Sequence, residues 1–182
     1  MTLKPQHFGK NKIDFVVASS RKQNRISTTE DGTLTLFQNN SSSSSRFPYT
    51  SSTITPATAE WRQDVLSADI TGDNLTDLVV THTDQDKIKL LRNDGSANFT
   101  DNGSVSVGDV PINLISGDWN SDNQTDLAVV NRGNSSVSIL ENSSGVFSVS
   151  QTLSVSAHPI QIAGGDWDTD NDLSLIHISA PT

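Results

Sequence analysis

The stretch Asp118-Trp-Asn-Ser-Asp122-Asn-Gln-Thr-Asp126 decides how this chain is interpreted, because it is one of three related copies. The first copy reads Asp69-Ile-Thr-Gly-Asp73-Asn-Leu-Thr-Asp77, and the third reads Asp166-Trp-Asp-Thr-Asp170-Asn-Asp-Leu-Ser174. Their first aspartates are 49 and 48 residues apart. A period of this length marks a chain built from equivalent structural units.

The similarity continues on both sides of these copies. Upstream, Pro111-Ile-Asn-Leu matches Pro159-Ile-Gln-Ile, and downstream the segment 88–93 matches 137–142. A more divergent copy lies at the N-terminus, where Leu34-Thr-Leu-Phe-Gln-Asn39 corresponds to 88–93. That copy contains extra polar residues, which we interpret as loop insertions at 20–25 and 41–45.

Within one period, alternating apolar residues predict four short strands separated by turn residues, at about 112–117, 127–131, 136–142 and 147–155. Four strands per unit at this period are typical of a β-propeller blade. We therefore expect an all-β fold, a partial β-propeller of about three four-stranded blades. Each blade would carry its Asp-rich loop between its first two strands. Closed rings usually have four to eight blades, so we expect a fragment of a longer protein.

The period divides the chain into five parts. We expect an incomplete first blade with loop insertions, a second and a third blade, the start of a truncated fourth blade and a non-native tail, at 1–60, 61–109, 110–157, 158–172 and 173–182. The tail is expected because Leu173-Ser-Leu-Ile replaces the Asp-Leu-Val-Val that the repeat requires, and because 173–182 resembles a translated sequencing-library adaptor.

The three Asp-rich loops have the oxygen pattern of a calcium site. Side-chain oxygens fall at positions 1, 3, 5 and 9, and position 7 would add its backbone carbonyl, which suits the six to eight oxygen ligands of Ca²⁺. Asn at position 6 tolerates the positive φ of a sharp bend. The candidate ligands are Asp69, Thr71, Asp73, Leu75 and Asp77; Asp118, Asn120, Asp122, Gln124 and Asp126; and Asp166, Asp168, Asp170 and Asp172, with Ser174 in place of the third position-9 aspartate.

Charge supports the same interpretation. Ten of the 21 acidic residues lie in these loops, and three bound calcium ions would reduce the net charge from −9 to about −3. The alternative is that the Asp and Asn residues only form β-turns. The N-terminal copy, at 6–14, contains lysines instead of carboxylates and is expected to bind no metal.

Three other functions can be compared with this pattern. An EF-hand needs Glu at position 12, where Val80 and Val129 stand, so it is excluded. Paired carboxylates could serve a glycosidase, but the metal pattern already accounts for them. Trp119 and Trp167 at position 2 could stack on sugars, yet Ile70 holds the same place in the first loop, which favours packing between blades.

The combination Asp-(Trp/Ile)-x-x-Asp-Asn-x-Thr-Asp-Leu-(Val/Ala)-Val resembles the FG-GAP/VCBS repeat family of integrin-alpha-like propellers and bacterial secreted proteins. The resemblance implies calcium held in a hairpin between the first two strands of each blade. It also implies an extracellular or cell-surface module for binding, adhesion or scaffolding, with protein or glycan ligands and no enzymatic activity. The alternative is an accessory propeller of a secreted hydrolase or lyase whose catalytic part is missing.

Composition limits the partners further. The net charge of −9 disfavours nucleic acid, and no apolar run is long enough for membrane insertion. The chain has no cysteine, which excludes disulfides and thiolate metal sites. Residues 1–10 contain no hydrophobic signal segment, so we expect the export signal to lie outside this chain.

Overall fold

The computed structural model describes residues 3–6, 14–19, 33–39, 49–54, 64–156, 158–165 and 174–179. All regular structure in these residues is β-strand. The strands are β1 (Leu3–Gln6), β2 (Asp14–Ser19), β3 (Thr33–Asn39), β4 (Tyr49–Ile54), β5 (Val65–Ala68), β6 (Asp77–His82), β7 (Lys87–Asn93), β8 (Phe99–Ser106), β9 (Pro111–Gly117), β10 (Asp126–Asn131), β11 (Ser136–Ser143), β12 (Val146–Ser154), β13 (Pro159–Gly165) and β14 (Ser174–Ser179).

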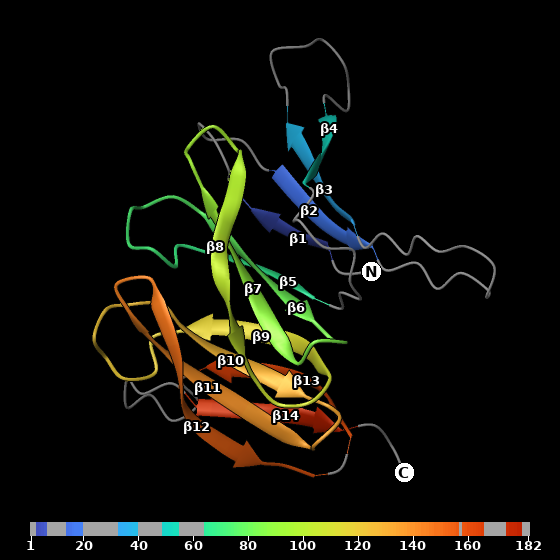
Figure 1. Cartoon of the computed structure of the whole chain (residues 1–182), viewed down its shortest axis with the longest axis vertical. Coiled ribbons are helices and arrows are strands. Elements are labelled where there is room, and N and C mark those ends of the chain that lie inside the picture. Colours follow the sequence, from blue (N-terminus) through green and yellow to red (C-terminus); the bar gives the residue numbers. More distant parts are fainter. Residues whose placement is uncertain are drawn as a thin grey trace, which may run out of the picture.

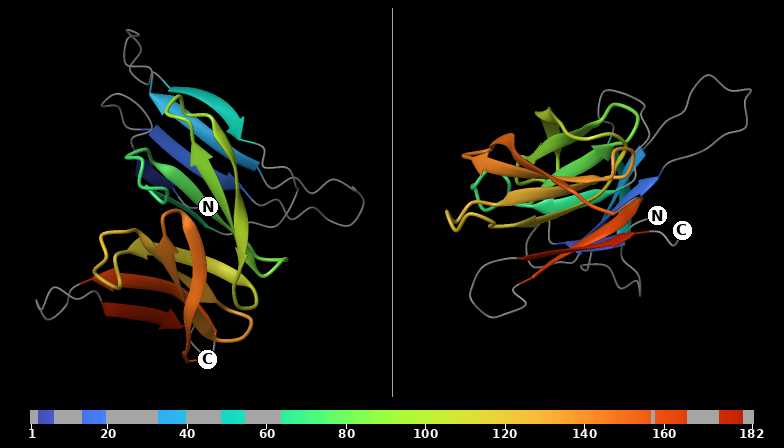
Figure 2. Two further views of the ribbon diagram at one scale, coloured as in Figure 1. Left: turned by 60° about the vertical axis from the view of Figure 1, so that its left-hand side comes forward. Right: turned by 90° about the horizontal axis from the view of Figure 1, so that it is seen from below.

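The strands form four antiparallel sheets, each made of strands consecutive in sequence. The first, second and third sheets have the orders β1-β2-β3-β4, β5-β6-β7-β8 and β9-β10-β11-β12, and the fourth pairs β13 with β14. Figure 1 shows the sheets following one another in chain order, and Figure 2 shows the same succession from two other sides. The expectation of an all-β fold is confirmed, and the four strands predicted at 112–155 match β9 to β12.

The sheets pack face to face because their central strands are apolar on both sides. In β6, Leu78 and Val80 pack with β3 of the first sheet, while Val79 faces the third sheet. In β10, the Leu127 and Val129 side chains face the second sheet, and their neighbours in sequence face the fourth. Successive residues of a strand point to opposite faces, so a strand covered on both faces needs apolar residues at successive positions, as at 78–80 and 127–130.

Polar contacts join the first strands of successive sheets. The buried carboxylate of Asp64 accepts hydrogen bonds from Asn113 Nδ2 (2.7 Å) and from the Leu114 N–H (3.2 Å). One period later, Asn113 Oδ1 accepts a bond from the Ile162 N–H (3.1 Å). These bonds repeat at the same interval as the sequence, and they fix the register of β5, β9 and β13, which lie beside one another.

Some expectations concern residues outside the described part of the chain. They include the insertions at 20–25 and 41–45, and the division into five parts stays a prediction. Residues 174–179 pair with β13 as strand β14, and Ser174 lies opposite Gly165, as Asp126 lies opposite Gly117. The described residues include no helix long and apolar enough to cross a membrane.

Candidate metal centre

Two Asp-rich loops join the first and second strands of their sheets. The first loop, 69–77, connects β5 to β6, and the second loop, 118–126, connects β9 to β10. In both, the position-9 aspartate is the first residue of the second strand and is fully buried. The third loop, which contains Asp166, Asp168, Asp170 and Asp172, lies outside the described residues, and nothing tests those ligands.

The backbone of the two loops bends at the predicted place. Asn74 and Asn123, at position 6, have φ values of 62° and 64°. Position 4 also adopts positive φ, with 78° at Gly72 and 60° at Ser121, which the sequence did not reveal. Glycine adopts this conformation without steric cost, whereas serine does so at a cost of about 1–2 kcal/mol.

The position-1 aspartate organises each loop from inside. Asp69 accepts hydrogen bonds from the N–H groups of Gly72 (2.7 Å) and Asn74 (2.7 Å). Asp118 accepts the equivalent position-6 bond from the Asn123 N–H (2.9 Å), and its second bond comes from the position-5 N–H of Asp122 (3.1 Å). The same side chain therefore closes the same bend in both copies.

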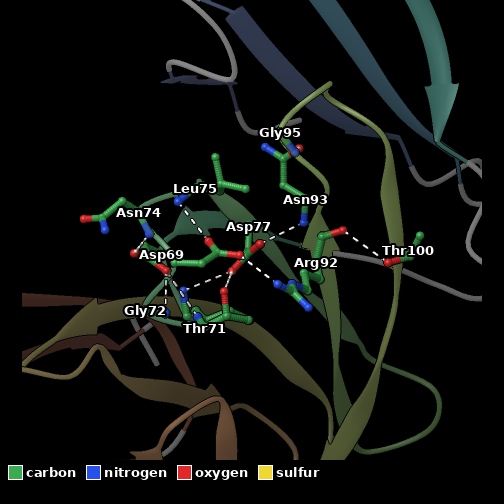
Figure 3. Close-up of polar contacts among 12 residues, drawn as sticks. Asp69, Thr71, Gly72, Asn74, Leu75, Asp77, Arg92, Asn93, Gly95 and Thr100 are labelled. Atoms are coloured by element: carbon green, nitrogen blue, oxygen red, sulfur yellow. Dashed lines mark hydrogen bonds and ion pairs between the residues drawn. The ribbon is translucent and has the colours of Figure 1, made fainter.

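The first loop brings three carboxylates together. Asp69, Asp73 and Asp77 each offer an oxygen atom, and these atoms all lie within 4.8 Å of one another. Two oxygens bound to one calcium ion at about 2.3–2.6 Å can be separated by no more than about 5 Å, so this spacing fits a shared ion. Thr71 lies beside the group, with its hydroxyl donating to Asp77 Oδ2 (3.2 Å). Figure 3 shows Asp69, Thr71 and Asp77 close together, with Arg92 beside them.

The carboxylates of the first loop differ in their surroundings. Burial raises the pKa of Asp77, and the N–H groups of Asn93 and Ile70 offset this only in part. Asp73 is partly exposed and accepts a bond from Arg92 Nη2 of β7 (3.1 Å). Burial acts to raise the pKa of Asp73, but the Leu75 N–H and the Arg92 guanidinium together hold it below the usual value. Arg92 is therefore the counter-charge of this cluster.

The second loop has the same backbone bends but a different set of side-chain bonds. Asp122 Oδ2 accepts bonds from the side-chain amides of Asn120 (3.2 Å) and Gln124 (3.1 Å). Gln124 Oε1 also accepts a bond from the Ser144 N–H (2.6 Å). Among the described residues, the three aspartates of the second loop do not gather as those of the first loop do.

Two asparagines that the sequence analysis used only to align the repeats bond to the loops from the third strand of each sheet, β7 and β11. The Asn93 N–H donates to Asp77 Oδ1 (2.8 Å), and Asn93 Nδ2 donates to the Thr76 carbonyl (3.0 Å). In the second loop, the Asn142 N–H donates to Asp126 Oδ1 (2.9 Å) and its Nδ2 to the Thr125 carbonyl (3.0 Å). Their recurrence 49 residues apart was the signal that could have identified them.

The position-2 residues pack between sheets. Ile70 is fully buried in the core between the second and third sheets. Trp119 packs against the core between the third and fourth sheets, and a Cβ added at Gly164 would approach its Cη2 to 2.7 Å. The packing interpretation is thus confirmed for Trp119, while Trp167 lies outside the described residues.

Comparisons with known proteins agree with this architecture. The search of curated proteins found no match to the chain. The FG-GAP-like repeat family matches residues 69–129 and 118–177, which together cover more than half of the chain and include both described loops. The repeats indicate a β-propeller-like module. The chain therefore belongs to the FG-GAP repeat family.

Proposed function

We propose that this chain is a calcium-binding β-propeller module that acts outside the cell in binding, adhesion or scaffolding. The observation that carries the proposal is the cluster of Asp69, Asp73 and Asp77, whose carboxylate oxygens lie within 4.8 Å of one another. Hard oxygen donors at this spacing suit Ca²⁺. FG-GAP repeats often bind calcium, and this cluster lies within the matched repeat.

In this proposal, calcium would be held in each loop by the side chains at positions 1, 3, 5 and 9. Calcium supplies the positive charge that four or more converging oxygens need. The residues of the loop keep those oxygens in place, since Asp69 is oriented by the N–H groups of Gly72 and Asn74, and Asp77 by those of Ile70 and Asn93. Two filled loops would reduce the formal charge from −9 to about −5, because each ion adds two positive charges.

We propose a binding role rather than catalysis. The clustered carboxylates each accept at least one backbone N–H bond, which directs their oxygens toward an ion. Extracellular modules bind calcium at roughly 10⁻⁴ to 10⁻³ M, a range in which a loop with one hydroxyl and three carboxylates would be filled outside the cell. Protein or glycan ligands are the partners we propose for the assembled propeller.

Calorimetric titration of the full chain with calcium, together with thermal unfolding in calcium and in chelator, tests this proposal. We expect saturable binding and a raised unfolding midpoint, since an ion that binds only the folded state stabilises it. Asp73→Asn should remove binding at the first loop. Asp84→Asn, in the exposed turn between β6 and β7, is the matched control and should change nothing. A folded protein that takes up no calcium would refute the proposal.

A further inference from the structure

Asn142 contacts both described loops, although it belongs to the third sheet. Its Nδ2 group donates one bond to the Thr125 carbonyl of the second loop (3.0 Å) and another to the Ile70 carbonyl of the first loop (3.1 Å). Its Oδ1 accepts the Gly145 N–H (2.8 Å). Asn142 is only 5% exposed, so water does not compete strongly for these bonds.

These bonds connect the deepest carboxylates of the two loops. The Ile70 N–H donates to Asp77 Oδ2 (3.2 Å), while the carbonyl of the same residue accepts Asn142 Nδ2. At the other end, the Asn142 N–H donates to Asp126 Oδ1 (2.9 Å). One residue of the first loop and one asparagine are thus all that separates the position-9 aspartates, Asp77 and Asp126.

The two loops also line the same cavity, which is partly open and has a volume of about 110 Å³. It is lined from the first loop by Asp69, Thr71 and Gly72, and from the second by 123–125, with Asn142 and Gly145 closing it. Gly145 faces the first loop, where a Cβ added to it would be in van der Waals contact, 3.7 Å from Thr71 Cα. The two loops are therefore neighbours as well as partners of Asn142.

Asn93 offers an internal comparison. It occupies the equivalent position in the second sheet and makes the same three local contacts, to Asp77, Thr76 and Gly95. In the described part of the chain its hydrogen bonds stay within its own sheet. Asn142 makes, in addition, the bond across to Ile70 of the neighbouring loop.

We propose that Asn142 couples calcium binding in the first loop to calcium binding in the second, so that an ion in either loop raises the affinity of the other. This inference rests on the proposed calcium function. An ion held by Asp126 would restrain the Asn142 backbone through the bond between them, and the Asn142 side-chain amide would in turn restrain Ile70, whose N–H orients Asp77. The second ion would then bind a loop that the first had already restrained, which is the origin of positive coupling. Asn142 is a positioning residue, since it acts through Asp126 and Ile70.

The test compares full-length variants that each have one active loop. Asp73→Asn leaves only the second loop, and Asp122→Asn leaves only the first. Calorimetric calcium titration should show that each remaining loop binds about fivefold more weakly than in the parent chain. When Asn142→Ala is added to the parent and to both single-loop variants, the affinity of each loop should no longer depend on whether the other loop is active. When Asn93→Ala is added instead, as the matched control, that dependence should remain.

A second measurement uses an unaltered Asn142. In the Asp122→Asn variant, calcium can enter only the first loop, yet the side-chain amide resonance of Asn142 should shift with its saturation. The side-chain amide of Asn131, which bonds to Ser136 and Ser138 within the third sheet, should not. Equal calcium affinities in the parent and single-loop chains, or an Asn142 resonance that does not shift, would overturn the coupling but not the calcium function. Absence of binding in the parent chain would instead overturn the calcium function, and the coupling with it.

Discussion

The first and second loops carry identical residues at positions 1, 5, 6, 8 and 9, yet their carboxylates are arranged differently. In the first loop three carboxylates gather around a common point, and Arg92 of β7 bonds to one of them. In the second loop Asp122 is held by the amides of Asn120 and Gln124 instead. The residue one period after Arg92 is Glu141, which carries the opposite charge.

This difference teaches that the motif sets the backbone of a loop, whereas its neighbours set its charge balance. A guanidinium beside Asp73 offsets the repulsion that three converging carboxylates would otherwise suffer. Among the described residues, the second loop has no cation bonded to its aspartates, and Asp122 accepts bonds from neutral amides instead. In the proposed function, calcium would have to compete with Arg92 in the first loop, whereas in the second it would replace amide bonds.

The largest effect on the free energy of unfolding is expected at position 9, where the two loops are alike. Asp77→Ala and Asp126→Ala should each lower the free energy of unfolding by about 3 kcal/mol even in chelator, because each leaves two buried N–H groups without an acceptor. Denaturant unfolding measures this. Asp122→Ala, at an exposed position, should cost far less. Equal losses at positions 5 and 9 would show that burial does not separate the two kinds of aspartate.

Removal of calcium should have the next largest effect. Each filled loop should stabilise the fold by about 2.7 kcal/mol at a free calcium concentration one hundred times its Kd. Thermal unfolding in calcium and in chelator should therefore differ by several degrees in the parent chain. The difference should fall by about half in Asp73→Asn and in Asp122→Asn. An unchanged difference in both variants would place the stabilising ion elsewhere.

Exchanging the neighbouring charges should sharpen the comparison. Arg92→Gln should raise the calcium affinity of the first loop about fivefold, because one partly exposed charge contributes about 1 kcal/mol. Glu141→Gln should lower the affinity of the second loop, by no more than the same factor. Titrations of the two variants provide a matched pair. Shifts of the same sign in both would contradict the proposed role of these two positions.

The smallest effect is expected at position 4. Ser121→Gly should stabilise the protein by about 0.5 kcal/mol, because the strain of positive φ exceeds the entropy cost of glycine in the unfolded chain. Gly72→Ser, the reverse change at the same position of the first loop, should destabilise by a similar amount. Thermal unfolding in chelator compares them. If Gly72→Ser stabilised the protein, strain at positive φ would not determine stability at position 4.

Most of the strand arrangement was predictable from the sequence, because it depends on local patterns. Alternating apolar residues located β9 to β12 to within two residues, and Asn74 and Asn123 marked the bends in the loops. The apolar runs at 78–80 of β6 and 127–130 of β10 suit strands covered on both faces. Each of these features follows from residues that are neighbours in sequence.

The contacts that distinguish the loops were not predictable in the same way. Arg92 reaches Asp73 across 19 residues, which depends on strand pairing within the second sheet. Asn142 reaches Ile70 across 72 residues, which depends on how the second and third sheets are placed against one another. Gln124 was expected to offer its backbone carbonyl, and its side chain turned out to bond to Asp122 and Ser144. The carbonyl ligands of Leu75 and Gln124 stay predictions.

The most direct test of the central claim is a crystal structure of the full chain grown in calcium, with the ions located by anomalous scattering. We predict one ion bound by Asp69, Asp73 and Asp77 and another bound by Asp118, Asp122 and Asp126, each at about 2.3–2.6 Å from its oxygens. Arg92 should release Asp73 or share it with the ion. Ordered loops without anomalous density, with Arg92 still bonded to Asp73 and the amides still on Asp122, would contradict the account.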